Sequence, residues 1–218
     1  MKERCRRRDK LVVGIGINDA SYSISSYKYA DGRAVQTLCP FYSRWKDMLR
    51  RCYSESFLKK RPTYRGCSVC EEWITFSNFK AWMETQDWEG MHLDKDLLVY
   101  GNTVYSPKTC AFVPDKINTL IGYSKGSESG YIGIYTEKRG DVIKYSAQVS
   151  HNRKRFGIYL DASSAHNRWQ TEKANEIESS ISWYATQGCF RTDVAEALMS
   201  RVWKLRLDAS MDVETKQL

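Results

Sequence analysis

Residues 131–183, YIGIYTEKRGDVIKYSAQVSHNRKRFGIYLDASSAHNRWQTEKANEIESSISW, decide the fold of the C-terminal half of this chain. Strand-like runs lie at Tyr131–Glu137, Ile143–Ser150 and Arg155–Leu160, and the turn-like sequences KRGDV and HNRK separate them. From about Ser163 to Trp183, apolar residues recur at helical spacing. We therefore expect a three-stranded antiparallel sheet that packs on one helix, within an α+β protein.

A linker and a basic N-terminus divide the rest of the chain. Gly122–Gly130, GYSKGSESG, contains three Gly, three Ser and two charged residues, which is typical of a linker. The sequence predicts four regions. They are a basic arm and irregular N-terminal segment at 1–40, a first module at 41–121, the sheet-and-helix module at 130–190, and a C-terminal helix and tail at 191–218.

Composition limits the classes of protein to which the chain can belong. Its 218 residues carry 34 Lys plus Arg against 26 Asp plus Glu, a net charge of +8, and residues 1–10 alone contribute +4. This balance allows nucleic acid as a partner. No apolar run reaches the length of about 18 residues that a membrane span needs, so no membrane contact is expected. The charged N-terminus lacks the apolar segment of a secretory signal, and the seven Cys are an odd number. We therefore expect reduced thiols and a cytoplasmic location.

The first module has its own pattern of elements. Apolar spacing predicts helices at Phe41–Tyr53 and Trp73–Gln86, and the aromatic residues of the second helix share one face, which is typical of a core. Lys59–Gly66 is a basic, Pro-containing loop. Leu93–Tyr105 has the alternation and the Gly-Asn pair of a hairpin, and a short helix is predicted at Asp115–Ile121, behind a proline.

This first module resembles a divergent form of the HNH nuclease domain of phage homing-type endonucleases. The resemblance covers about residues 42–120 and rests on RCY (51–53), YRGCSVCEEW (64–73), FSNFKAW (76–82) and LDKDLLVYGNTVYSPKTCAFVPDKIN (93–118). In this form a Leu-Asp-Lys stretch stands where most members have His-His or Asp-His. The resemblance implies a ββα-metal module, in which a hairpin and a helix hold one divalent metal ion that stabilises the phosphate and the leaving oxygen.

The resemblance also implies roles for single residues. Asp94 falls at a metal ligand, and Asn118 falls at the terminal Asn or His, which reaches the metal from the helix. Lys95 falls at the position of the general-base His, and Asn102 lies near the middle Asn of the motif.

The Lys at the base position changes the expected chemistry. A Lys with a pKa of about 10.4 is protonated at pH 7, so we expect Lys95 to clamp phosphate rather than to accept a proton. His92 lies two residues before Asp94 and could take the place of the base. Asp96 would share a strand face with Asp94 and would complete a carboxylate pair for a hard cation. Alternatively, both carboxylates are solvated hairpin residues that pair with Lys95 or Arg65.

Four cysteines of the module fit a structural zinc site, because many HNH domains carry one. Cys67 and Cys70 form a C-x-x-C pair, and Cys52 and Cys110 would complete a tetrahedral set. The alternative is that these cysteines are ordinary small buried residues.

The second module resembles the Apetala/ethylene-response-factor type of DNA-binding domain, which is often fused behind phage HNH domains. The matching segments are GYIGIY (130–135), KYSAQV (144–149), KRFGIY (154–159) and SAHNRWQTEK (164–173). The resemblance implies that the sheet enters the major groove, where Arg contacts guanine edges and Lys contacts phosphates. The candidate DNA-binding residues are Lys138, Arg139, Lys144, Gln148, Arg153, Lys154 and Arg155. Alternatively, they are the charged solvent face that any small sheet has.

Together these features predict an endonuclease that hydrolyses phosphodiester bonds in double-stranded DNA with Mg²⁺ or Mn²⁺. One alternative is a catalytically inactive, nuclease-derived DNA-binding protein. Another is a phage protein that binds a host enzyme, located in the host cytoplasm, for which the amphipathic stretch Thr192–Leu207 is a candidate surface.

Overall fold

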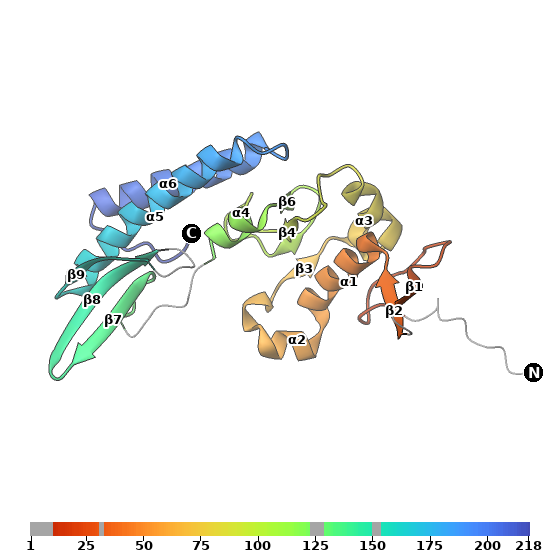
Figure 1. Ribbon diagram of the computed structural model, residues 1–218, viewed down its shortest axis with the longest axis horizontal. Helices are drawn as coiled ribbons and strands as arrows, with labels where there is room; N and C mark the ends of the chain where they lie inside the picture. Colours follow the sequence, from red (N-terminus) through yellow and green to blue (C-terminus); the bar gives the residue numbers. More distant parts are fainter. Residues whose placement is uncertain (1–10, 31–32, 123–128, 150–153) are drawn as a thin grey trace, which may run out of the picture. The chain divides into compact units, whose positions relative to one another are not determined.

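A computed structural model describes residues 11–30, 33–122, 129–149 and 154–218, which form two compact units, Met1–Phe112 and Val113–Leu218 (Figure 1). Helices and small sheets occur in both units, so the expected α+β class is confirmed at this coarse level. The predicted basic arm at 1–10, most of the linker at 122–130, and Arg153 lie outside the described residues. The second unit begins at Val113, before the linker at which the sequence placed the boundary.

The first unit consists of short elements. They are β1 Ser25–Ala30, β2 Arg33–Leu38, α1 Pro40–Tyr53, α2 Glu55–Lys60, the 3-10 turn η2 Pro62–Tyr64, β3 Ser68–Val69, the 3-10 turn η3 Glu71–Ile74, α3 Phe76–Met83, β4 His92–Asp94, β5 Val104–Tyr105 and β6 Ala111–Val113. The expectation of an irregular segment up to residue 40 was wrong, because β1 and β2 form an antiparallel hairpin. Every residue of β2 is exposed, so the hairpin lacks the apolar alternation by which a half-buried strand is recognised.

Aromatic side chains form the core of the first unit, as the helical spacing predicted. Trp45 of α1 and Trp73 of η3 are completely buried, and the Trp45 indole donates a hydrogen bond to the Trp73 carbonyl over 2.7 Å. Phe76 and Phe79 of α3 fill the space between them, and both rings contact a Trp edge-on or tilted. This core fixes α1, and with it the segment α2–η2 that follows.

The second unit is a sheet covered by helices. Its elements are α4 Asp115–Leu120, β7 Ile134–Arg139, β8 Val142–Val149, β9 Lys154–Tyr159, α5 Ala162–Tyr184 and α6 Thr192–Ser210. The three strands form one antiparallel sheet in the order β7–β8–β9, and α5 packs on it.

Helix α6 lies along α5 (Figure 1). Its completely buried side chains are Val194, Leu198, Val202 and Leu205. These residues make up the apolar face of Thr192–Leu207 that suggested a host-protein surface. That face is therefore used within the second unit, and the helix belongs to the same compact unit as the sheet.

A buried polar network holds the C-terminal tail against α5. The backbone N–H of Thr215 donates to His166 Nε2 over 3.0 Å, so Nδ1 carries the ring proton and donates to the Ile132 carbonyl over 3.1 Å. Burial lowers the pKa of His166, which keeps the ring neutral. The Gln170 amide donates to the Val213 carbonyl over 2.8 Å. The same imidazole thus joins the tail, α5 and the segment just before β7.

Candidate metal site and candidate nucleic-acid interface

The strand that carries Asp94 does not form the expected hairpin. β4 pairs with β6, whereas β5 pairs in parallel with β3 through Ser68↔Val104 and Val69↔Tyr105. The predicted turn at Gly101-Asn102 exists, since Gly101 has a φ of +69°. A local turn signal shows where the chain reverses, but not which strands pair, and for this reason the predicted hairpin at Leu93–Tyr105 was wrong.

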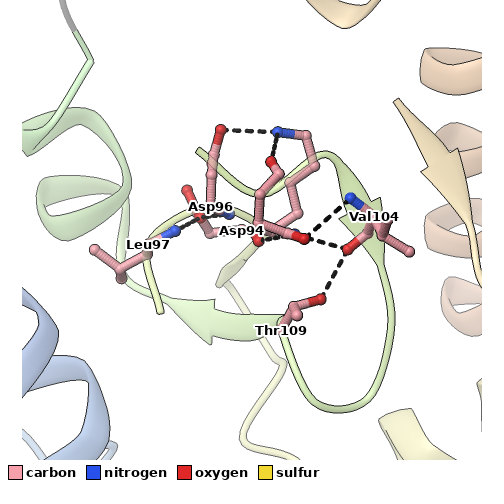
Figure 2. A network of polar contacts seen from close by, with 7 residues as sticks. Asp94, Asp96, Leu97, Val104 and Thr109 are labelled. Atoms are coloured by element: carbon pink, nitrogen blue, oxygen red, sulfur yellow. Dashed lines mark hydrogen bonds and ion pairs between the residues drawn. The ribbon is translucent and has the colours of Figure 1, made fainter. Parts of the chain in front are cut away.

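Asp94 lies at the end of β4 and shapes the turn that follows (Figure 2). Its Oδ1 accepts hydrogen bonds from the backbone N–H groups of Asp96, over 2.9 Å, and Leu97, over 2.7 Å. Burial, with the nearby charge of Asp96, raises the pKa of Asp94 to about 6. Because β4 ends at Asp94, Asp96 lies in the turn, and the expectation that the two carboxylates share a strand face was wrong.

Lys95 is buried between a carboxylate and a carbonyl. Only 8 % of the residue is exposed, and its Nζ donates to Asp96 Oδ2 over 2.8 Å and to the Asn102 carbonyl over 3.2 Å. Burial alone would lower the pKa of Lys95, but the hydrogen bond and charge of Asp96 outweigh it, and the pKa is raised. The ammonium therefore stays protonated at neutral pH and cannot act as a base. Two of its three N–H groups already have protein partners, which leaves one for a phosphate.

The other residues expected in the catalytic and metal set lie on different elements. Asn102 closes the loop, because its amide donates to the carbonyls of Lys95, over 2.6 Å, and Val104, over 2.7 Å. It is thus a turn residue rather than a group directed at a substrate. His92 is partly buried in β4, two residues before Asp94. Asn118 lies on α4 in the second unit, so the first unit contributes only Asp94 and Asp96 of the expected metal set.

The four cysteines of the expected zinc set have free thiols. Cys52, Cys67 and Cys110 are buried and Cys70 partly so; burial raises the pKa of all four, for Cys52 and Cys110 to about 12. Within the described ranges, no three His, Cys, Asp or Glu side chains form a group that could hold a metal ion. The burial of these thiols is what the alternative interpretation expects, in which the cysteines are ordinary small buried residues.

The sheet of the second unit has one face against α5 and one open face. Ile134 pairs with Ala147, both are buried, and Val149 follows on the same face of β8. Since side chains alternate along a strand, the neighbours of these residues point away from α5. The residues of this open face are Tyr135, Glu137, Arg139, Val142, Lys144, Ser146, Gln148 and Arg155, and of these Ser146 is buried.

The register divides the candidate DNA-binding residues between the two faces of the sheet. Lys154 pairs with Val149, which puts it on the α5 side at the end of the sheet, and Lys138 has the same orientation on β7. Tyr135 and Glu137, which are not in the set of candidate DNA-binding residues, also belong to the open face. The alternation of buried Ile134 with its neighbours is the signal that could have found them.

Arg155 stands at the centre of a contact cluster on the open face. Its guanidinium carbon lies 3.5 Å from the centroid of the Tyr135 ring, and its strand register places it directly opposite Gln148. Arg155 is exposed, and in the part of the chain that the structure describes it has no acidic partner. A stacked guanidinium loses less freedom when it binds, because its plane is already fixed.

Comparisons with protein-family models, with curated proteins and with solved structures gave no match. In the described ranges, no helix has both the length and the apolar character that crossing a membrane requires.

Proposed function

We propose that this chain binds double-stranded DNA through the open face of β7–β8–β9. The observation that carries the proposal is the guanidinium of Arg155, which stacks on Tyr135 opposite Gln148 on a face that α5 leaves open and has no acidic partner among the described residues. A twisted antiparallel ribbon fits the major groove, and a planar guanidinium with free N–H groups matches the two acceptors of guanine. Lys144 on the same face supplies a charge for phosphate.

Replacing Arg155 with Ala is expected to weaken binding to a cognate duplex by about tenfold to a hundredfold, the range for losing one bidentate base contact. The measurement is fluorescence anisotropy with labelled duplexes at fixed salt, after selection of a preferred sequence from a random pool. Lys154→Ala is the matched control, since it removes a neighbouring charge from the opposite face. Equal losses in the two variants, or no affinity of the wild type at low salt, would contradict the proposal.

A second candidate function is metal-dependent cleavage of the bound DNA by the HNH-like module. It is favoured by the order of the elements, because β4 pairs with β6 and α4 begins two residues after β6 in the chain. Asp94 and Asp96 offer carboxylate oxygens of the kind that Mg²⁺ prefers, although the Lys95 ammonium already neutralises one of them. A bound ion would stabilise the phosphate and the leaving oxygen. Lys95 would hold charge near the site, and His92 is the nearest imidazole in the sequence.

Supercoiled plasmid separates the two candidates. We expect the full chain to nick it with Mg²⁺ or Mn²⁺, and we expect Asp94→Asn to abolish nicking, because the amide keeps the Oδ1 acceptor but lacks the charge that holds the ion. If wild type and variant both bind DNA and neither nicks it with any divalent metal, the chain is a DNA-binding protein without this activity.

A further inference from the structure

The segment from α2 to the end of η2 carries a cluster of cations that the proposed sheet interface does not use. Lys59 and Lys60 end α2, and Arg61 and Arg65 lie on either side of η2. All four residues are exposed. The chain contains no acidic residue from position 56 to position 70, so this surface carries four positive charges within seven residues.

The backbone that presents these cations is fixed to the core of the first unit. Leu58 is buried, and the ring of Phe57 meets that of Tyr64 edge-on at 5.5 Å. Two arginines of α1 cover the same rings, with Arg50 4.8 Å from the centroid of Phe57 and Arg51 5.9 Å from that of Tyr64. The backbone of this segment is therefore held in place, and binding of a ligand to its cations does not require the entropic cost of ordering a loop.

The cations of this cluster differ from their neighbours in having no side-chain partner among the described residues. Arg51 is paired with Asp47 over 2.9 Å, and Arg50 is paired with the same carboxylate. By contrast, the side chains of Lys59, Lys60, Arg61 and Arg65 make neither an ion pair nor a hydrogen bond to any residue that the structure describes.

Stability of the helix explains only part of this arrangement. Lys59 and Lys60 lie in the last turn of α2, where cations interact favourably with the helix dipole. Arg61 is the C-cap residue of α2 and shares in that interaction, whereas Arg65 follows η2 and lies beyond the last turn of α2. Four like charges within seven residues repel one another, and a polyanion relieves that repulsion.

We propose that Lys59, Lys60, Arg61 and Arg65 form a second DNA-contact surface, which binds backbone phosphates of the duplex without regard to sequence. This inference rests on the proposed function, since the sheet is what selects the DNA. Each strand of a duplex presents one phosphate charge about every 3.4 Å along the axis. This spacing is close enough to supply a phosphate to each of four neighbouring cations. Exposed cations of this kind add affinity through the release of counterions, and their contribution decreases as salt increases.

The test is the salt dependence of duplex binding by the full chain. The variant replaces all four cations with Gln, and Kd is measured for one duplex of about 30 base pairs from 50 to 300 mM NaCl. Loss of four phosphate contacts is expected to make the slope of log K against log salt shallower by about 3 to 4. Arg61→Gln with Arg65→Gln, which keeps Lys59, Lys60 and the other residues of α2, is expected to make it shallower by about 2.

A matched control removes the same charge from scattered positions. Arg33, Lys46, Lys108 and Lys216 are exposed and lie far apart in the sequence, and their replacement by Gln is expected to change the slope by less than about 1. A control slope as shallow as that of the cluster variant would overturn the inference, because net charge alone would then explain the effect. So would a wild-type slope in the cluster variant, provided that Arg155→Ala still weakens binding. Absence of salt-dependent binding in the wild type would instead remove the proposed function itself.

Discussion

Replacing Gly133 with Ala is expected to destabilise the second unit by about 3 kcal/mol or more, enough to abolish DNA binding by the sheet. Gly133 has a φ of +74°, a conformation that costs an L-residue about 1–2 kcal/mol. A Cβ at this position would also lie 2.0 Å from Nε1 of Trp169. That indole is buried and stacks on His166 with ring centroids 5.2 Å apart, so it has little room to move. Thermal unfolding followed by circular dichroism and duplex affinity are the two measurements.

Gly140→Ala separates the two causes of this effect. Gly140 also has a positive φ, +61°, but its Cβ would meet no atom within 4 Å. The variant therefore contains the backbone strain without the collision, and we expect it to lose only about 1–2 kcal/mol. If both variants lose the same stability, close packing of Gly133 against Trp169 is not what holds the sheet to α5.

The second unit was largely predictable because its signals are local. Each strand is short and is bounded by a turn sequence, and α5 and α6 have apolar residues at helical spacing over many turns. The face of the sheet on which each charged side chain lies was less predictable, because it depends on strand register. Lys138 and Lys154 carry a positive charge as Arg155 does, yet the alternation of side chains along the strands puts them on the opposite face.

The first unit was less predictable because its strands are two or three residues long. β4 and β6 are separated by a loop that contains β5, and β5 pairs with a strand more than thirty residues earlier in the chain. No local pattern specifies such a pairing. The sequence identified Asp94, Lys95, Asp96 and Asn102 as a group, and these residues do meet. They meet, however, as a hydrogen-bonded turn in which Lys95 is buried and Asn102 binds backbone.

Replacing Asp94 with Asn is expected to stabilise the first unit at neutral pH. In the folded protein the pKa of Asp94 is raised to about 6, from 3.8 in the unfolded chain. Between these two values the folded state binds more protons than the unfolded state, so the free energy of unfolding falls as pH rises from about 4 to 6. At pH 7 the ionised carboxylate then costs roughly 3 kcal/mol, and Asn avoids this cost. Denaturant unfolding at pH 7.5 should show a gain of about 1–3 kcal/mol, and the gain should disappear near pH 4.

Asp94→Ala separates the effect of the charge from that of the hydrogen bonds, because it also removes the acceptor of two partly buried backbone N–H groups, those of Asp96 and Leu97. Relative to Asp94→Asn, which also lacks the charge, we expect a loss of about 1–3 kcal/mol at every pH, since an unsatisfied donor does not titrate. If Asp94→Asn is instead neutral or destabilising at pH 7.5, burial of the ionised carboxylate does not destabilise the fold.

A gain in stability of Asp94→Asn that accompanies loss of nicking would have a further consequence. A carboxylate that costs the fold free energy but is needed for cleavage is a group kept for its chemistry, and added Mg²⁺ should then stabilise the wild type and leave Asp94→Asn unchanged.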